Sequence, residues 1–425
     1  MNALTRNVLE SFELPDISKH LASRLEHSYL CHRPDDDISF DYGVTKGQYL
    51  GNDESLVKRI ITAYQGSFTG QHSTVESMWF TWIGPMKEPI HEALMEGDFP
   101  AVTEFLRDPS SSHLFQGFDN LVVQDDGSQL VPKYWARWMA GWTYDALRRL
   151  TEAVGARPMA YPEGSGQAGK AGSGVPAPDE LLRDLDDSFG FRIDFPNPFQ
   201  NEVGIPTSRG TATYRAVHAL YQAWRVKQLV EGKPDAKVLE IGAGLGRSAY
   251  YARKMGIKDY TLIDLHMTNV SQAYYLGTLC GYDSVILHGE DGARADAFKI
   301  MPPDFFLEGL ETYDLIVNVD SFTEMSFAAA SAYMYEIKKR ARCLLSINHE
   351  ANEFTVAQMV SEIGEECRSR TPSWIRKGYV EEVVYLLMPN PEEPQDIATE
   401  KVKSGNKWWR RLAAVRQPDA KPKGL

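Results

Sequence analysis

The chain has 425 residues, four cysteines and a formal net charge of −13. This acidic balance argues against a general binder of nucleic acid or of acidic membranes, and the length predicts about two to three domains. Hydrophobic residues make up 43% of the chain, yet no stretch approaches the roughly 20 apolar residues of a membrane span. The scattered cysteines form no CxxC pair, which favours a reducing, cytoplasmic environment.

Residues 1–150 are predicted to form a mainly helical N-terminal domain. Apolar residues recur there at helical spacing, for example at Leu56, Ile60 and Tyr64. The same region holds five of the nine tryptophans: Trp79, Trp82, Trp135, Trp138 and Trp142. Such aromatic density is typical of a packed helical core, and a platform for a sugar ring or a flat substrate is the alternative that the sequence leaves open.

Two segments are predicted to lie outside the folded domains. Residues 151–180 include the glycine- and serine-rich stretch 162–174, which cannot build a core and is interpreted as a flexible linker. Residues 391–425 contain several prolines and end in a basic stretch, so we expect a mobile C-terminal tail. The segment between them, 181–390, is the candidate catalytic domain.

Short apolar runs alternate with helical patterns from residue 237 onward. The predicted strands are 237–241, 259–263, 284–288, 315–319 and 343–347, followed by an antiparallel strand at 379–387. Strands that alternate with helices imply a Rossmann-like, doubly wound and mostly parallel sheet with helices on both faces. Ligands bind such sheets at the carboxyl ends of the strands, so the residues that follow each strand are the candidate site residues.

A glycine-rich turn follows the first predicted strand, with the pattern Glu240-x-Gly242-x-Gly244-x-Gly246. Glycine lets the backbone approach a ligand closely, and the helix that starts near Arg247 directs unpaired amides toward the same place. The dinucleotide fingerprint requires a third glycine where Arg247 stands, so a nicotinamide dehydrogenase is disfavoured. The pattern resembles instead the first motif of class I S-adenosylmethionine-dependent methyltransferases, in which this loop passes under the methionine part of the cofactor.

Acids follow the next two predicted strands. Asp264 ends the second strand, 22 residues after Gly242, where a carboxylate can accept hydrogen bonds from two ribose hydroxyls. The alternative for Asp264 is a helix N-cap. Glu290 and Asp291 follow the third strand, and in class I methyltransferases an acid or amide at this place often meets the adenine amino group. A simple turn closed by Asp291 and Gly292 is the alternative.

The ends of the fourth and fifth strands carry the candidate catalytic residues. Asp320, which also borders the cofactor, and Glu324 are candidates for a general base or for ligands of a divalent metal. A capping box formed by Ser321 and Glu324 is the structural alternative. His349 is the best single general-base candidate because imidazole titrates near neutral pH, and Asn348 beside it is a candidate substrate contact.

The segment 195–210 precedes the sheet and is rich in turn-forming residues. It is predicted to be an irregular loop whose polar side chains, Glu202 and Arg209 among them, lie close to the ligand and contact the substrate. An exposed connection without a function is the alternative.

Four stretches together resemble the sugar O-methyltransferase family of class I methyltransferases. They are 240–246, 264–265, 320–325 and 378–382. The resemblance covers about residues 195–390, and the motifs do not extend to the helical N-terminal part. It implies S-adenosylmethionine as the methyl donor and a sugar hydroxyl as the acceptor.

We therefore predict an S-adenosylmethionine-dependent O-methyltransferase that acts on a hydroxyl of a sugar or a glycosylated small molecule. Two alternatives stay open: a metal-dependent methyltransferase of a non-sugar natural product, and a non-catalytic cofactor-binding scaffold in a biosynthetic complex. The partner is expected to be a small-molecule acceptor rather than nucleic acid or a membrane. The sequence leaves open whether the chain forms a homo-oligomer.

Overall fold

The structure of the protein, a computed structural model, describes residues 41–47, 51–67, 84–109, 112–115, 133–159, 176–291, 294 and 296–386. These residues all belong to one compact unit. The predicted linker stretch 162–174, the predicted tail 391–425, Trp79 and Trp82 lie outside the described residues, as does the side chain of Trp135. No helix within the described ranges is long and apolar enough to cross a membrane.

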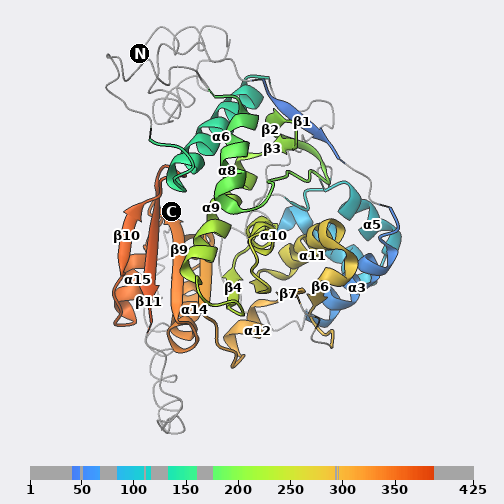
Figure 1. Cartoon of the computed structure of the whole chain (residues 1–425). Helices are drawn as coiled ribbons and strands as arrows, with labels where there is room; N and C mark the ends of the chain where they lie inside the picture. The colour runs from blue at the N-terminus through green and yellow to red at the C-terminus, as the bar shows by residue number, and fades with distance from the viewer. Residues whose placement is uncertain are drawn as a thin grey trace, which may run out of the picture. The chain divides into compact units, whose positions relative to one another are not determined.

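The described residues form an eight-stranded mixed sheet around which the other elements are arranged (Figure 1). Its strands in chain order are β4 (Lys237–Ile241), β5 (Asp259–Ile263), β6 (Val285–Leu287), β7 (Phe298–Met301), β8 (Leu315–Val319), β9 (Cys343–His349), β10 (Ser369–Pro372) and β11 (Tyr379–Tyr385). In space the order is β10-β11-β9-β8-β4-β5-β7-β6. Every neighbouring pair in this sheet is parallel except the two made by β11. This confirms the predicted Rossmann-like, doubly wound and mostly parallel sheet.

The predicted strands agree closely with the observed ones. The first, second and fourth match β4, β5 and β8 residue for residue, because each is a short apolar run with clear ends. The antiparallel last strand is confirmed as β11. The prediction missed β7, which lies between β5 and β6, and the edge strand β10, whose four residues are all exposed and show no apolar alternation.

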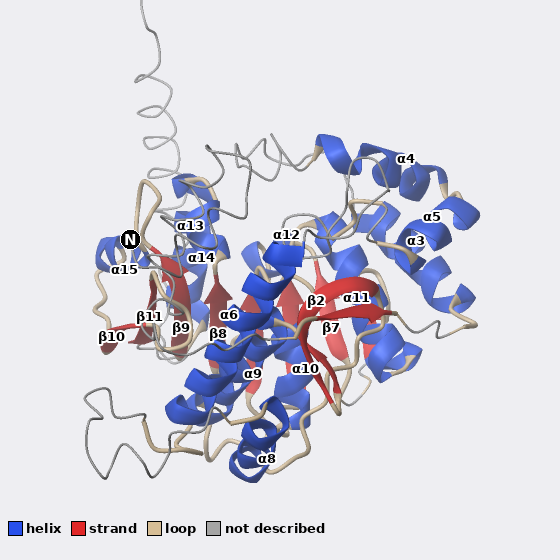
Figure 2. Ribbon diagram, turned by 90° about the horizontal axis from the view of Figure 1, so that it is seen from above, coloured by secondary structure: helices blue, strands red, loops and turns tan. Residues whose placement is uncertain are grey.

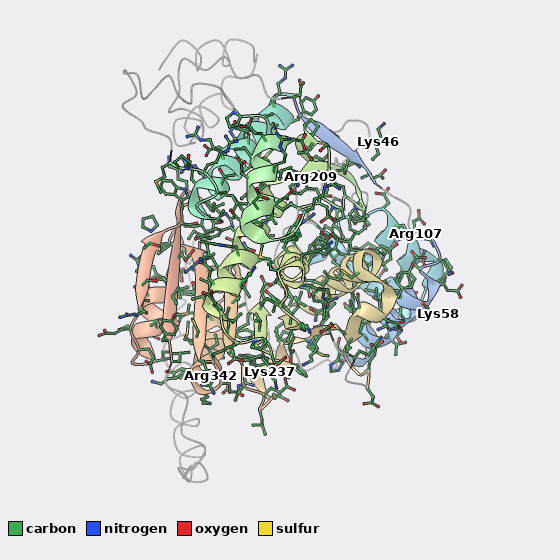
Figure 3. The ribbon with its side chains drawn as sticks, in the orientation of Figure 1. Lys46, Lys58, Arg107, Arg209, Lys237 and Arg342 are labelled. Carbon is green, nitrogen blue, oxygen red and sulfur yellow. The ribbon has the colours of Figure 1, made fainter. Side chains whose placement is uncertain are left out.

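Helices cover both faces of the sheet, as Figure 2 shows. Successive strand residues alternate between two buried clusters, with Val238 and Val317 in one and Leu239 and Ile316 in the other. The helices of the first cluster are α9 (Tyr214–Leu229), α10 (Arg247–Lys254) and α11 (His266–Cys280), and those of the second are α12 (Pro303–Leu307), α14 (Phe327–Arg340) and α15 (Val356–Glu362). Lys237, the first residue of β4, marks the amino-end edge of the sheet (Figure 3). The carboxyl ends lie at the opposite edge.

Further helices of the N-terminal part are connected to the sheet through α11 and α9. They are α3 (Glu54–Ser67), the 3-10 helix η3 (Pro85–Lys87), α4 (Glu88–Glu96), α5 (Phe99–Arg107), α6 (Lys133–Ala153) and α8 (Pro178–Phe189). α3 contacts α11, and α6 contacts α9. Leu56 of α3 and Tyr275 of α11 belong to the same buried cluster, and Tyr274 donates a hydrogen bond of 2.7 Å to Asp53. The helical part and the sheet therefore share a core.

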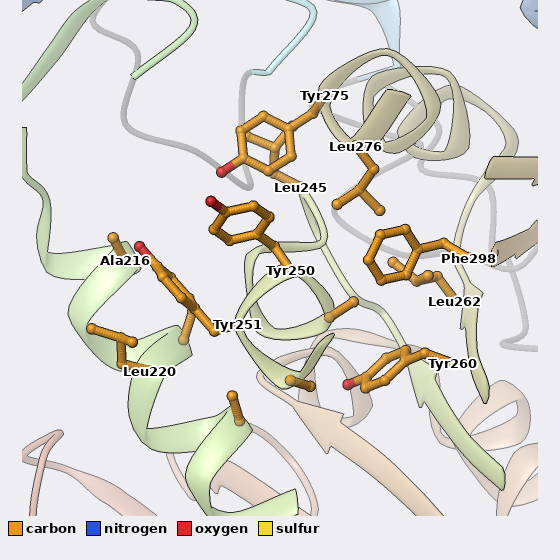
Figure 4. Packing of buried hydrophobic residues seen from close by; sticks show 14 of the residues in the cluster. Ala216, Leu220, Leu245, Tyr250, Tyr251, Tyr260, Leu262, Tyr275, Leu276 and Phe298 are labelled. Carbon is orange, nitrogen blue, oxygen red and sulfur yellow. The ribbon is translucent and has the colours of Figure 1, made fainter. Parts of the chain in front are cut away.

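Tyrosines fill much of this shared core (Figure 4). Tyr250 and Tyr251 of α10 pack edge to face, with ring centroids 5.1 Å apart. The Tyr251 hydroxyl donates to the Asp194 carbonyl at 3.0 Å, and the Tyr260 hydroxyl donates to Glu240 at 2.8 Å. Because these buried hydroxyls are paired, the rings add apolar area to the core without leaving a polar group unsatisfied.

The predicted irregular loop at 195–210 is wrong, because most of it is a β-hairpin. β2 (Gln200–Thr207) pairs antiparallel with β3 (Gly210–Ala212) and with β1 (Gly43–Lys46), which forms a three-stranded sheet. Two of the residues that suggested a loop, Gly204 and Pro206, lie inside β2. Its partner β1 stands more than 150 residues earlier in the chain, so no local pattern could announce the pairing.

We predict that Gly204→Ala destabilises the fold. A Cβ at this position would lie 2.0 Å from the Ala212 carbonyl oxygen across the hairpin, and such overpacking typically costs about 1–3 kcal/mol. The matched control is Gly66→Ala in α3, where a Cβ would meet no described atom within 4 Å. That change should stabilise the helix by roughly 0.5–1 kcal/mol. The midpoint of unfolding in guanidinium should therefore fall for Gly204→Ala and rise for Gly66→Ala. If both midpoints shift in the same direction by a similar amount, the described hairpin is contradicted.

Candidate active site

The glycine turn joins the end of β4 to the start of α10 with an unusual backbone path. Gly242, Gly244 and Gly246 all have positive φ angles, of 73°, 55° and 82°. A Cβ on Gly242 would lie 2.1 Å from the Ser321 Oγ, and one on Gly246 would lie 3.0 Å from the Leu276 side chain. Packing and backbone geometry therefore already require glycine at two of these positions, whether or not a ligand is present.

Glu240 stabilises the glycine turn through hydrogen bonds with side chains of α10 and β5. It is 2% exposed, and the Ser248 hydroxyl lies within hydrogen-bond distance of both carboxylate oxygens, at 2.6 and 2.7 Å. The Tyr260 hydroxyl donates to the same carboxylate at 2.8 Å. Burial raises the pKa of Glu240 to about 7, against the lowering effect of the two hydroxyls. These contacts tie β4 to α10 and β5, so Glu240 acts on the site through the position of the turn.

Asp264 links the glycine turn to the end of β5. Its Oδ2 accepts hydrogen bonds from the Gly244 amide at 3.0 Å and from the Gln272 side chain at 3.1 Å, and its Oδ1 accepts one from the Leu265 amide at 2.8 Å. Burial raises the pKa of Asp264 to about 7, although the two amides lower it. The N-cap alternative is wrong, because α11 begins at His266 with Leu265 as its N-cap and no side-chain cap among the described residues.

Lys87 of η3 also interacts with Asp264, and no sequence motif marks this lysine. It is 6% exposed, and burial lowers its pKa to about 7 while Asp264 raises it. In turn Lys87 lowers the pKa of the carboxyl group. A residue of the N-terminal helical part therefore contributes charge to the candidate cofactor site.

The two acids after β6 differ in their surroundings. Glu290 binds Arg59 of α3 through contacts of 2.5 and 2.8 Å and also accepts from Arg294 at 3.1 Å. Burial would raise the pKa of Glu290, but these arginines and the Leu287 amide bring it below its usual value. Asp291 is exposed. Of the two adenine candidates, Asp291 is the one whose carboxylate is not part of this ion-pair network.

A polar network closes the carboxyl ends of β4, β8 and β9. Asn318 donates to the Ile241 carbonyl at 3.0 Å and to the Ser321 Oγ at 2.6 Å, and Ser321 donates to the same carbonyl at 3.1 Å. Asn348 donates to Asn318 and to Ser346 at 2.9 Å each. The predicted capping box is wrong: the N-cap of α13 (Ser321–Glu324) is Asp320, and no side-chain capping bond exists there among the described residues.

Asp320 occupies a strained position at the end of β8. Its φ of 67° and ψ of −42° are rare for a residue with a side chain, and such strain often marks functional sites. Its Oδ2 accepts a hydrogen bond of 2.5 Å from Arg376, whereas its buried Oδ1 has no partner among the described residues. The Arg376 guanidinium lies 3.7 Å from the centre of the Tyr379 ring. Arg376 was not predicted, because it stands in a loop without a motif.

Glu324 and His349 both interact with Tyr379. Glu324, in α13, is close enough to raise the pKa of that phenol, although burial is the largest cause of the rise. His349 ends β9, pairs with Tyr379 across β11 and meets its ring edge on at 5.6 Å. The His349 Nδ1 accepts a hydrogen bond of 3.3 Å from the Ala351 amide. This contact engages the Nδ1 of His349 in the turn that follows β9.

The two predicted substrate contacts in the 195–210 segment are bound within the protein. Glu202 is buried in an ion pair with Arg247, the first residue of α10. Arg209 donates to the Asp186 carboxylate at 2.7 Å and to the Ile193 carbonyl at 3.3 Å. Since protein groups engage both side chains, we do not include them in the proposed acceptor site.

The predicted metal alternative lacks a ligand set in the part of the chain that the structure describes. No three histidine, cysteine, aspartate or glutamate side chains gather there as a metal ion requires. Asp320 binds Arg376 instead.

No protein-family model matches the chain. No curated protein matches it either. Among solved structures, the chain is similar to magnesium protoporphyrin IX methyltransferase (ChlM) from Synechocystis PCC 6803 with bound SAM, at 14% identity and a TM-score of 0.31 over 40% of this chain and 79% of that chain. It is similar to the mitomycin 7-O-methyltransferase MmcR at 13% identity and a TM-score of 0.31, over 58% and 69% of the two chains.

The glycopeptide N-methyltransferase MtfA complexed with sinefungin is similar at 15% identity and a TM-score of 0.30, over 40% of this chain and 94% of that chain. At TM-scores this low, we base the fold on the strand order and strand directions given above.

We predict that Gly242→Ala destabilises the protein mainly through Ser321. The clash and the positive φ together should cost about 2–4 kcal/mol. In a Ser321→Gly background the same substitution should cost at least about 1 kcal/mol less, because the Oγ and Cβ that it meets are gone. Gly256→Ala is the control: its φ is also positive, at 96°, but a Cβ there meets no described atom within 4 Å. The free energies of unfolding of the two single variants and the double variant are measured by chemical denaturation. If the effects of the Gly242 and Ser321 substitutions simply add, this contact is contradicted.

Proposed function

We propose that this protein is an S-adenosylmethionine-dependent O-methyltransferase whose acceptor is a sugar or a glycosylated small molecule. The observation that carries the proposal is the hydrogen bond from the Gly244 amide to Asp264. It joins the glycine turn after β4 to the acid after β5, and the methyltransferase resemblance assigns both to one cofactor. They meet at the carboxyl ends of neighbouring parallel strands, where sheets of this type bind ligands.

The donors and acceptors at this edge fit the adenosyl part of the cofactor. Asp264 accepts from Gly244, Leu265 and Gln272, and a carboxylate has about four acceptor positions. Ribose hydroxyls can therefore bind the carboxylate by adding to these bonds or replacing one of them. Asp291, exposed after β6, is the proposed contact for the adenine amino group.

When bound, S-adenosylmethionine supplies a methyl group activated on a sulfonium centre. The residues of the chain have to align an acceptor hydroxyl with that group and to take up its proton, and alignment provides most of the acceleration in a displacement of this kind. We assign the proton to Asp320, because it follows β8, the strand beside β4, and its Oδ1 has no partner in the described chain.

Aromatic side chains near this edge support a ring-shaped acceptor. Trp138 and Trp142 of α6 are partly exposed, with ring centroids 5.0 Å apart, and Trp142 stacks on Tyr214 at 5.1 Å. Aromatic faces of this kind pack well against the apolar face of a sugar ring. The platform alternative is therefore the one that we propose for these two tryptophans.

We predict that the full-length protein binds S-adenosylhomocysteine, the product form of the cofactor, in calorimetric titration. Asp264→Asn should weaken this binding about tenfold or more, because hydrogen bonds to a charged group contribute about 1.5–3 kcal/mol. Asp259→Asn is the matched control, since Asp259 lies at the opposite end of the same strand and pairs with Lys299. If the unmodified chain does not bind the ligand, or if the two variants bind equally well, the proposed cofactor site is wrong.

The binding should also depend on pH. Because burial raises the pKa of Asp264 to about 7, part of the free protein is protonated at neutral pH, and ribose hydroxyls favour the ionised form. Affinity for S-adenosylhomocysteine should therefore rise as the pH increases through 7 and level off above it, with a slope approaching about tenfold per pH unit on the acidic side. Asp264→Asn should abolish this slope. An unchanged slope in the variant would assign the titration to another group.

A further inference from the structure

His218, in the second turn of α9, is a buried polar group that the proposed mechanism leaves unexplained. His218 is 6% exposed, and its Nε2 has no hydrogen-bond partner among the described residues. An unpaired polar atom in a protein interior is unfavourable, and most such atoms in folded proteins have a partner. This nitrogen therefore points to a partner that is not part of the described chain.

The position of α9 brings His218 to the carboxyl edge of the sheet. The C-terminal end of the helix leads into β4, so its first turns lie toward the end of the sheet where the strands finish. Tyr221 donates a hydrogen bond of 2.6 Å to Glu381 of β11. His218 lies one helical turn before Tyr221 on the same face, and Tyr379, paired with His349, lies two residues before Glu381. His218 is thus near the end of β9.

The groups that face His218 keep its ring neutral. The Tyr214 ring meets it edge on at 5.5 Å, and the charged neighbours are Arg215 of the same helix and Arg376 of the loop before β11. Burial first, and then these two cations, hold the pKa of His218 well below its ordinary value. A neutral imidazole offers one donor and one acceptor, which suits a hydroxyl group better than it suits a carboxylate or a phosphate.

Arg376 connects His218 to the proposed catalytic carboxylate. The same guanidinium that faces His218 donates to the Asp320 Oδ2 at 2.5 Å. Asp320 also interacts with the Tyr379 side chain and raises the pKa of that phenol, although burial is the largest cause of the rise. Two buried polar atoms that lack partners in the described chain, His218 Nε2 and Asp320 Oδ1, therefore belong to residues that interact with the same arginine.

A row of aromatic rings leads to His218. Trp138 and Trp142 lie 5.0 Å apart, Trp142 and Tyr214 are stacked with an angle of 7° between their planes, and the Tyr214 ring then meets His218. The buried Nε1 of Trp138 is likewise without a partner among the described residues. Trp138 and Trp142 are the partly exposed members of the row, and a polar atom without a partner in the described chain lies at each end of it.

We propose that His218 is an acceptor-binding residue whose Nε2 hydrogen-bonds a hydroxyl of a neutral, polyhydroxylated ring packed along this row. The inference rests on the proposed methyltransferase function and names the residue that selects the acceptor. His218 positions the ring so that the reacting hydroxyl faces Asp320, and it takes no proton itself because its neighbours disfavour the imidazolium.

The test compares His218→Phe with His218→Gln in the full-length protein. The probes are tritium-labelled S-adenosylmethionine with UDP-glucose, UDP-N-acetylglucosamine, dTDP-rhamnose and methyl glucoside, and kinetics are measured on the member with the highest transfer. His218→Phe should raise KM about tenfold or more while kcat stays within about threefold and the pH profile is unchanged. His218→Gln, which can still hydrogen-bond, should recover most of the loss. An unchanged KM, or a fall in kcat with an altered pH profile, would overturn the inference.

Two controls separate binding from folding. His218→Phe should unfold at the same temperature as the parent chain or higher, because it removes a buried atom without a partner; a lower temperature would mean that His218 has a structural partner and would count against the inference. His91→Phe breaks the 2.7 Å contact between His91 and Tyr64 in the N-terminal helices. That change should lower stability and leave KM unchanged.

Failure of this inference can be told apart from failure of the proposed function. If S-adenosylhomocysteine does not bind, the function is wrong. If it binds but no panel member is methylated, the imidazole signals of the ¹⁵N-histidine-labelled complex are recorded by NMR with each panel member at high concentration. A shift of the His218 signal that is absent in His218→Phe supports the inference, and no shift with any member contradicts it.

Discussion

The hydrogen bond between the Gly244 amide and the Asp264 carboxylate is the contact on which the candidate site depends. It fixes the glycine turn after β4 against the end of β5, and the positive φ angles of the three glycines let the turn take this path. Ser321 and Asn318 brace the other side through the Ile241 carbonyl. The turn is thus held from β5 and from β8, which pre-organises the edge of the sheet before any ligand binds.

Charge at this edge is balanced by residues from outside the parallel strands. Lys87, from the N-terminal helical part, faces Asp264, and Arg376, from the loop before β11, binds Asp320. Each carboxylate therefore has a basic side chain beside it, and each pair joins a residue at the edge of the sheet to a segment distant in sequence. The proposed donor and acceptor sites lie next to each other because β5, β4 and β8 are neighbours in the sheet.

Local patterns predicted the strands and the acidic residues that follow them, because a strand end and a glycine turn each consist of consecutive residues. Tertiary pairings were not predictable in this way. β2 pairs with β1, which is remote in the chain, so no local pattern distinguishes it from a loop. The predicted capping box at Ser321 is wrong because the Ser321 hydroxyl donates to the Ile241 carbonyl of β4 instead. His218 and Arg376 belong to no motif. His218 is identified by its burial and by the missing partner of its Nε2 in the described chain, and Arg376 by its hydrogen bond to Asp320.

The most direct test of the account is a crystal structure of the full-length protein grown with S-adenosylhomocysteine. The account predicts that the ligand lies at the carboxyl ends of β4 and β5, with its ribose hydroxyls on Asp264, its adenine toward Asp291 and its sulfur nearest Asp320. A ligand bound elsewhere, or one at this edge that makes no contact with Asp264, would contradict the central claim.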